Sequence, residues 1–132
     1  MKRKPSGITD ITRPNILAVD DVPSVLKSIE LALKDTFNVH ALSKSEDVMD
    51  FLRDNKPDLI LLDNLMPVLT GFDLIPLIRV SPVHKNTPIV IVTTESRIEY
   101  VREAISLGAT DYVLKPFEPK ELRDKVAKHL GL

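Results

Sequence analysis

Five polar residues stand at the ends of short apolar runs and form the part of this sequence that could perform chemistry. Asp20 and Asp21 follow one run, Asp63 follows another, and Thr93 and Lys115 close the last two. If the runs are parallel strands, these side chains meet at the carboxyl edge of one sheet, where open α/β sheets bind ligands. Three carboxylates there repel one another by roughly 3–4 kcal/mol per pair at about 4–5 Å. A cation must offset that repulsion, and Mg²⁺, with its preference for oxygen ligands, is expected.

This set of side chains suits phosphoryl transfer. The transition state spreads negative charge over oxygens that a metal, a lysine and a hydroxyl donor can neutralise, and one carboxylate can act as the nucleophile. Each residue alone has an ordinary interpretation: a helix cap for any of the aspartates, a turn residue for Thr93, a solvated loop residue for Lys115. Their occurrence together at successive strand ends is what favours a site.

The elements that must position these residues alternate between short β-rich runs and longer helical patterns. Strands are expected over 15–20, 37–42, 58–63, 88–93 and 111–115. The third is the most apolar and is placed at the centre of the sheet. Strands that alternate with helices predict a parallel α/β sheet with right-handed crossovers. For five such units we expect a flavodoxin-like (βα)5 doubly wound sheet with strand order 2-1-3-4-5.

Helix starts are predicted from caps and prolines. The spacing of a capping box occurs at Ser43 and Glu46, at Ser96 and Glu99 and, less well formed, at Thr70 and Asp73. Pro76 is expected to kink the third helix or delay its start, because proline has no N–H to donate. The inward face of the fourth helix is expected to hold Ile98, Val101 and Ile105.

Composition and charge exclude several classes of protein. The chain has 132 residues, the size of one domain, and 18 basic against 19 acidic side chains, so direct DNA binding through phosphate contacts is not expected. The absence of cysteine excludes disulfides, thiolate zinc sites and cysteine nucleophiles. No apolar run approaches the roughly 20 residues that span a bilayer, and no secretory signal is visible, so we expect no membrane contact and a cytoplasmic location.

Charge is unevenly distributed along the chain. Residues 1–13 carry four basic side chains and one acidic one, and are expected to form a flexible basic tail before a domain over 14–132. The three histidines, His40, His84 and His129, are too dispersed for a metal site or a catalytic triad. They are expected in surface or edge packing.

Five motifs together resemble a known family. They are Val19-Asp20-Asp21, the run from Leu61 to Pro67 with Gly71, Val92-Thr93-Thr94, the run from Gly108 to Tyr112, and Lys115-Pro116-Phe117. In this order they strongly resemble a response-regulator receiver domain of two-component signalling, of the chemotaxis-regulator type, over about residues 14–131. Such a domain is a signalling module, which catalyses only its own phosphorylation and slow dephosphorylation.

The resemblance implies a role for each residue of the set. Asp63 is the expected phosphoacceptor, taking a phosphoryl group from the phosphohistidine of a sensor histidine kinase or a phosphotransfer protein. Asp21 and Asp63 are the expected direct Mg²⁺ ligands, with Asp20 acting through a water and the backbone carbonyl of Leu65 completing the protein ligands. Lys115 is expected to pair with Asp63 and then with the phosphoryl oxygens.

The resemblance also implies a switch. Thr93 is expected to move toward the phosphoryl group while Tyr112, the switch aromatic, rotates inward, and the Lys115–Pro116 bond is expected to be cis. The surface of the fourth helix, fifth strand and fifth helix would then change and bind an output protein or a second receiver. That surface would include Arg97, Tyr100, Val101, Lys120 and Arg123.

Two departures from the common pattern suggest slow loss of the phosphoryl group. Thr94 is larger than the small residue often found there, and Leu65 has no polar group to orient an attacking water. Asn64 and Pro76 are further departures, and neither is expected to touch the chemistry.

Other functions are weighed against this one. A haloacid-dehalogenase-type phosphatase needs Asp-x-Asp after its first strand, which Asp20-Asp21-Val22 does not supply. A flavodoxin-like nucleotide binder would place a glycine- or hydroxyl-rich loop there, whereas the chain has four glycines in all. A pseudo-receiver that never accepts phosphate and acts as an interaction module is the main alternative. The sequence leaves open whether the chain is a stand-alone regulator, a relay intermediate or a piece of a longer protein.

Overall fold

The computed structural model describes residues 12–132, so most of the predicted basic tail, residues 1–11, lies outside the described residues. The described part of that tail includes Arg13, whose guanidinium donates a 3.0 Å hydrogen bond to the carbonyl of Lys34.

The elements in chain order are β1 (Asn15–Val19), α1 (Pro23–Leu33), β2 (Asn38–Leu42), a 3₁₀ turn η1 (Ser45–Asp47), α2 (Val48–Asp54), β3 (Leu59–Leu62), α3 (Gly71–Arg79), β4 (Ile89–Thr93), α4 (Ile98–Leu107), β5 (Asp111–Leu114) and α5 (Pro119–His129).

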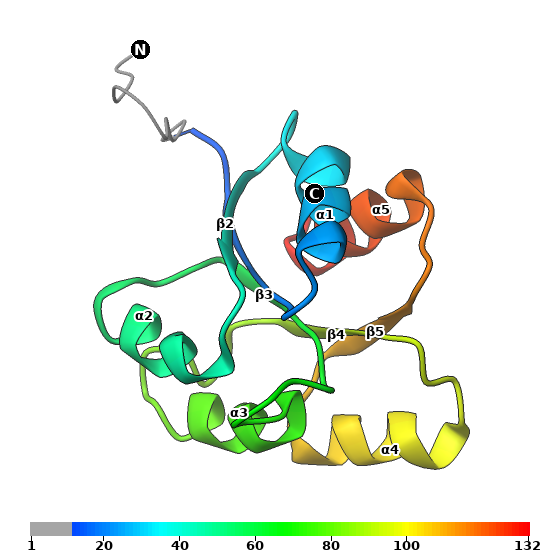
Figure 1. Cartoon of the computed structure of the whole chain (residues 1–132). Helices are drawn as coiled ribbons and strands as arrows, with labels where there is room; N and C mark the ends of the chain where they lie inside the picture. The colour runs from blue at the N-terminus through cyan, green and yellow to red at the C-terminus, as the bar shows by residue number, and fades with distance from the viewer. Residues whose placement is uncertain (1–11) are drawn as a thin grey trace.

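The five strands form one parallel sheet in the order β2-β1-β3-β4-β5, which confirms the predicted flavodoxin-like topology and the central place of β3 (Figure 1). The register pairs Val19 with Leu62 and Leu62 with Ile91. The carboxyl ends of β1 and β3 are therefore level with each other, and the residues that follow them lie side by side.

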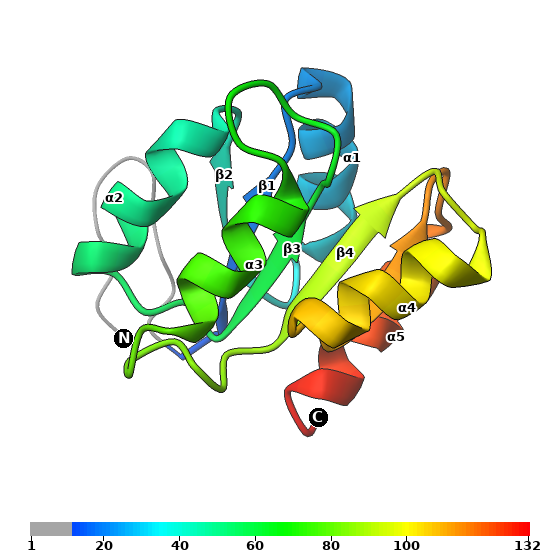
Figure 2. The ribbon, with the colours of Figure 1, turned by 90° about the horizontal axis from the view of Figure 1, so that it is seen from below.

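Helices cover both faces of the sheet, as a doubly wound fold requires. Figures 1 and 2 show α1 and α5 on one face and α2, α3 and α4 on the other. Side chains alternate between the faces along each strand, so Leu17 and Ile60 pack toward α2–α4 while Ile16 and Leu61 pack toward α1 and α5. This is why the strands read as continuous apolar runs in the sequence.

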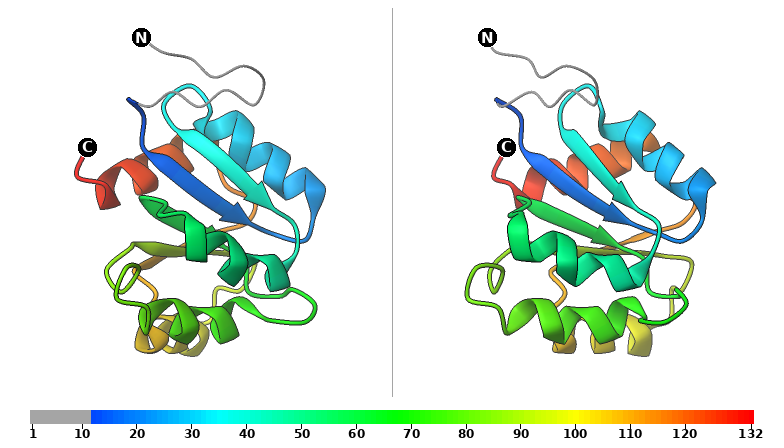
Figure 3. Two further views of the ribbon diagram at one scale, coloured as in Figure 1. Left: turned by 90° about the vertical axis from the view of Figure 1, so that its left-hand side faces the viewer. Right: turned by 60° about the vertical axis from the view of Figure 1, so that its left-hand side comes forward.

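The carboxyl ends of the strands are the side of the sheet where β–α connections leave for the helices. Figure 3 shows β1 and β2 running in the same direction toward the edge from which the loop before α3 projects. In the described residues, 12–132, no helix has the length and apolar content that crossing a membrane requires.

Of the three predicted capping boxes, the weakest spacing is the one that forms. The hydroxyl of Thr70 accepts the N–H of Asp73 at 3.1 Å, and the carboxylate of Asp73 accepts the N–H of Thr70 at 2.9 Å. The other two predictions are wrong. The chain is still extended at Lys44, beyond Ser43, and η1 opens without a side-chain cap.

The fourth helix also begins later than predicted. It starts at Ile98 after Arg97, which takes the N-cap position without a side-chain cap, and the carboxylate of Glu95 accepts the N–H of Arg97 at 3.0 Å just before the helix. Helix α3, by contrast, begins at Gly71, five residues before Pro76, so the proline does not delay its start.

Two expectations about burial are wrong. Ile98 and Ile105 of α4 are 57% and 45% exposed, and Ala104 is the buried residue of that helix, because α4 covers the edge of the sheet beside the four-residue strand β5. His84 is buried rather than superficial. Its Nε2 lies 2.8 Å from the carbonyl of Leu52, joining the segment before β4 to the end of α2.

The observed cap generates a stability prediction. Thr70→Ala removes the acceptor for the N–H of Asp73 and is expected to lower the free energy of unfolding by about 1 kcal/mol. Ser96→Ala is the matched control, since Ser96 caps no helix and its replacement is expected to change that free energy by less than about 0.5 kcal/mol. Urea denaturation of both variants checks this, and equal losses would contradict the assignment of the cap.

Candidate functional site

An acidic cluster lies at the carboxyl edge of the sheet. One carboxylate oxygen from each of Asp20, Asp21 and Asp63 lies within 4.8 Å of the others. Asp20 is fully buried, Asp63 is 6% exposed and Asp21 is more exposed than either. The N–H of Asp63 donates to the carbonyl of Val19 at 2.9 Å, so the sheet register itself brings the ends of β1 and β3 together. The sequence-based prediction that these three acids converge is borne out by the geometry.

Lys115 reaches the cluster from the end of β5. Its Nζ donates to Asp20 Oδ2 at 2.9 Å and to Asp63 Oδ1 at 3.4 Å, so the lysine pairs more closely with Asp20 than with the predicted partner. The second oxygen of Asp20 accepts the N–H of Val22 at 2.9 Å. Asp20 is thereby held in one orientation, while Asp63 keeps an oxygen free of these contacts.

The electrostatics of the cluster are unbalanced. Burial, and then the neighbouring charge of Asp20, raise the pKa of Asp63 even though Lys115 acts against them. Burial opposes the charge on Lys115, but its hydrogen bond to Asp20 and the charges of both carboxylates raise the pKa of the lysine overall. One lysine thus faces three carboxylates, and the oxygen-rich donor set matches what a hard divalent cation such as Mg²⁺ prefers.

Thr93, at the end of β4, is buried and its hydroxyl is engaged outside the acidic cluster. Thr93 Oγ1 accepts the N–H of Glu95 at 3.0 Å and lies 3.4 Å from the hydroxyl of Tyr100. The ring of Tyr100 packs on Phe72 with centroids 4.8 Å apart. Tyr100 was predicted only as a surface residue of α4, and no sequence spacing indicates its contact with Thr93.

Tyr112, the predicted switch aromatic, is half-buried on β5. It aligns with Ile91 in the neighbouring strand and packs against the core beneath α2–α4. Within residues 12–132 it forms no side-chain hydrogen bond to Thr93. The structure therefore brings Asp20, Asp21, Asp63 and Lys115 together, and places Thr93 and Tyr112 on the adjacent strands β4 and β5 with no hydrogen bond between the side chains of these two described residues.

The loop from Asp63 to Gly71 carries the predicted backbone ligand. Leu65 is 70% exposed, and Asn64 and Gly71 hold the loop on which it lies. The carbonyl of Asn64 accepts the N–H of Gly71 at 2.9 Å, and its side chain accepts the N–H of Phe72 at 2.8 Å. A Cβ on Gly71 would collide with the carbonyl oxygen of Asp63 and lie 2.9 Å from the Cα of Asn64. Asn64, expected to have no part in the site, thus closes the base of this loop.

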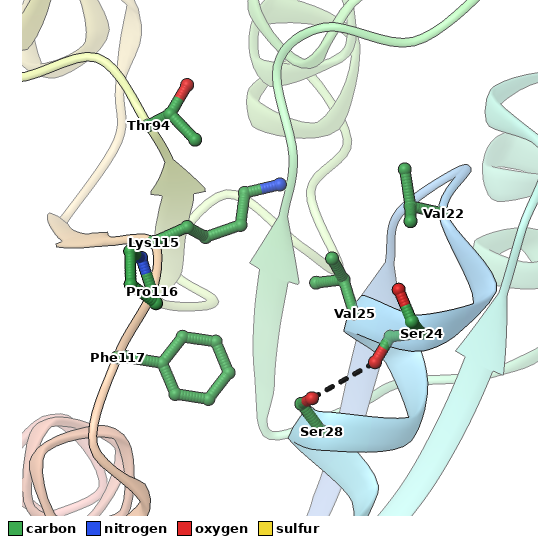
Figure 4. A pocket seen from close by; sticks show the side chains of 8 residues that line it. All are labelled: Val22, Ser24, Val25, Ser28, Thr94, Lys115, Pro116 and Phe117. Carbon is green, nitrogen blue, oxygen red and sulfur yellow. Dashed lines mark hydrogen bonds between the residues drawn. The ribbon is translucent and has the colours of Figure 1, made fainter.

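A cavity of about 460 Å³ opens beside the cluster, between the start of α1 and the segment after β5 (Figure 4). Figure 4 shows the Lys115 side chain extending from the end of β5 toward the end of β3. The Lys115–Pro116 peptide bond is cis, as the resemblance implies. The residues that line the cavity are Val22, Ser24, Val25, Ser28, Thr94, Lys115, Pro116 and Phe117.

Comparison with known proteins places the chain in a family. Residues 16–127 match the model of the response regulator receiver domain. The chain belongs to this family. The receiver is 34% identical over 122 residues to the DNA-binding response regulator MtrA of Mycolicibacterium smegmatis, an alignment that covers 92% of this chain and 52% of MtrA. The receiver thus spans about half the length of the curated relatives it matches first.

Solved structures of receivers share the fold. The chemotaxis response regulator CheY4 of Vibrio cholerae superimposes with a TM-score of 0.84 at 30% identity, over 89% of this chain and 98% of CheY4. The receiver domain of DrrB from Thermotoga maritima, solved in a form activated with BeF3, gives a TM-score of 0.82 at 27% identity, over 91% and 99% of the two chains. The acidic cluster described above is therefore the acidic site of a receiver domain of two-component signalling.

The raised pKa of Asp63 generates a pH-dependent prediction. The folded protein favours the protonated form of Asp63, and this protonation stabilises the fold. The stabilisation is fully present below pH 3.8, the ordinary pKa of this side chain, and is lost as the pH rises through the higher pKa of Asp63 in the folded protein. Asp63→Asn removes the charge, and in metal-free buffer at pH 7 it is expected to raise the thermal midpoint by a few degrees. The gain is expected to shrink as the pH falls.

The matched control is Asp35→Asn, at an exposed position after α1, which is expected to leave the midpoint unchanged. Thermal unfolding between pH 3 and pH 8, followed by circular dichroism, measures both variants. A gain for Asp63→Asn that grows toward acid pH would contradict the assigned direction.

Proposed function

We propose that this receiver is the phosphoacceptor of a two-component phosphorelay, in which Asp63 takes a phosphoryl group from the phosphohistidine of a sensor histidine kinase or a phosphotransfer protein in a Mg²⁺-dependent step. The domain that performs this function is residues 14–132, and it acts in the cytoplasm. The observation that carries the proposal is the position of Asp63: it ends the central strand, lies within 4.8 Å of Asp20 and Asp21, and is reached by Lys115.

Four protein groups are proposed to hold Mg²⁺: the carboxylates of Asp21 and Asp63 directly, Asp20 through a water, and the carbonyl of Leu65. When bound, the metal neutralises charge on the acids and on the incoming phosphoryl oxygens. The fit rests on the donor set, since three clustered carboxylates with one lysine leave an excess of negative charge that a divalent cation removes.

The remaining steps belong to side chains of the chain. A carboxylate oxygen of Asp63 attacks phosphorus as the bond between phosphorus and the donor imidazole breaks, so one P–N bond is exchanged for one P–O bond. Lys115 donates to a phosphoryl oxygen from the position where it now contacts Asp63. The cavity beside Lys115 leaves that side of the cluster open to a donor group.

The switch is proposed to begin at Thr93. For its hydroxyl to bind the phosphoryl group, it must leave the N–H of Glu95 and the hydroxyl of Tyr100. Tyr112 then moves into the space that Thr93 vacates, and α4 shifts. Helix α4 buries only Ala104 among its residues, so little packing opposes such a shift of population.

The surface that changes is that of α4, β5 and α5. This surface carries both charged and apolar groups, which an output protein or a second receiver would contact. The exposed side chains of Ile98 and Ile105 belong to its apolar part. The groups predicted for it from the sequence are Arg97, Tyr100, Val101, Lys120 and Arg123.

A direct test of the acceptor uses a small phosphodonor such as acetyl phosphate. With Mg²⁺ present, intact mass spectrometry is expected to show a gain of one phosphoryl group, which chelation of the metal and Asp63→Asn each abolish. Asp35→Asn, outside the cluster, is expected to accept the group as the wild type does. A gain that survives in Asp63→Asn would contradict the assignment of the acceptor, and no gain in the wild type would favour the interaction-module alternative.

The exposed, apolar Leu65 generates a prediction about phosphoryl lifetime. With no polar group at this position to orient water, and with Thr94 narrowing access, the phosphoryl group is expected to persist for minutes or longer. Leu65→Asn supplies an amide that can orient water and is expected to shorten the half-life roughly tenfold, less than the roughly 10²–10⁴-fold that a positioned general acid or base contributes. Leu65→Met, which keeps the position apolar, is the control, and a wild-type half-life of seconds would contradict the prediction.

A further inference from the structure

The loop between β3 and α3, residues 63–70, contains a strained turn. Val68 has a φ of 72°, and it is the one non-glycine residue with positive φ among residues 12–132. The N–H of Leu69 donates to the carbonyl of Pro67 at 2.9 Å, so Val68 is the central residue of a γ-turn of the rare positive-φ kind. A β-branched residue is strongly disfavoured in that conformation.

The side chain of Val68 does nothing to stabilise this turn. It is 74% exposed, so no burial of its apolar surface offsets the unfavourable backbone. The conformation must be held by the groups on either side of Val68, since strained residues persist only where their surroundings over-determine them.

Those flanking groups are held by one side chain, Ser45. Its hydroxyl donates to the carbonyl of Pro67 at 2.6 Å and accepts the N–H of Leu69 at 3.0 Å, so it bridges the two ends of the γ-turn. Ser45 lies in η1, more than 20 positions earlier in the chain, and is 2% exposed. Water therefore does not compete for these bonds.

The turn is joined to the proposed metal site through a short stretch of backbone. The base of the loop is held by Asn64 and Gly71, and its far end by Ser45. Leu65 lies between these two points, and its carbonyl accepts no hydrogen bond from residues 12–132. Opening of the far end would release Pro67 and Leu69, and the backbone around Leu65 would then be held by the carbonyl of Asn64, which accepts the N–H of Met66 at 3.0 Å.

We propose that Ser45 is a positioning residue for metal binding: it keeps the Val68 turn closed and thereby fixes the loop backbone that carries the Leu65 carbonyl, the proposed backbone ligand of Mg²⁺. This inference rests on the proposed function, because it uses Leu65 as a ligand. Ser45 touches neither the metal nor the phosphoryl group, and acts only through the loop.

The test is a rescue experiment on Mg²⁺ affinity, measured by titration calorimetry on the full chain. Ser45→Ala is expected to weaken Mg²⁺ binding about tenfold, the effect of losing one well-made buried hydrogen-bonding group. Val68→Gly is expected to leave the affinity within about twofold of the wild type, because glycine adopts positive φ without strain. The double variant is expected to recover most of the loss, since its turn no longer needs Ser45. Ser106→Ala, which removes an exposed hydroxyl bonded to the Glu103 carbonyl, is the matched control.

A second measurement separates this role from a general loss of stability. Hydrogen exchange at the Leu69 amide is expected to be faster in Ser45→Ala than in the wild type, while the amides of β3 keep their protection. An unchanged Mg²⁺ affinity in Ser45→Ala would overturn the proposal, as would a loss that Val68→Gly does not restore. If the wild type itself binds no Mg²⁺, the proposed function fails. In that case the hydrogen-exchange measurement still tests the loop, and an unchanged exchange rate at the Leu69 amide in Ser45→Ala would overturn the positioning role as well.

Discussion

Two buried carboxylates that share one lysine are the constraint on which the rest of this structure depends. Asp20 and Asp63 are almost completely shielded from water, and Lys115 is the cation within contact of both. Charges removed from water are costly unless they are paired. In this fold the pairing brings together the ends of β1, β3 and β5, which point the same way in one parallel sheet.

Around this cluster the fold combines rigid and yielding parts. The strands β1, β3 and β4 are buried on both faces, which gives the acids a fixed base. The groups proposed to move lie outside that base. Thr93 is bonded to a loop N–H and a helix hydroxyl, both of which it can exchange for another partner, and α4 is held by few buried side chains. A site that must switch benefits from this division, because the chemistry stays in place while the surface changes.

The arrangement could be predicted where local pattern and packing agree. Apolar runs and the alternation of strands with helices predicted the parallel α/β sheet, and the strand order expected for five such units of a flavodoxin-like fold is the one observed. Prediction failed where a side chain had a choice of partner. Ser43 and Ser96 had the spacing of caps, yet η1 and α4 both begin without a side-chain cap, and Glu95 bonds the N–H of Arg97 just before α4. Ile98 and Ile105 had helical spacing for burial, yet the edge of the sheet offered too little surface to cover them.

The sequence by itself determined the alternation of strands and helices and placed polar residues at the strand ends, because the elements follow from periods of hydrophobicity that act over a few neighbours. The order of the strands was expected from the fold class for five such units and does not follow from periodicity. Only the tertiary structure decided which atoms meet. Lys115 lies nearer to Asp20 than to Asp63, Thr93 faces Tyr100, and Ser45 holds the turn at Val68. These contacts join residues from different elements, so they depend on how the elements pack and where each side chain is directed, and no local pattern carries that information.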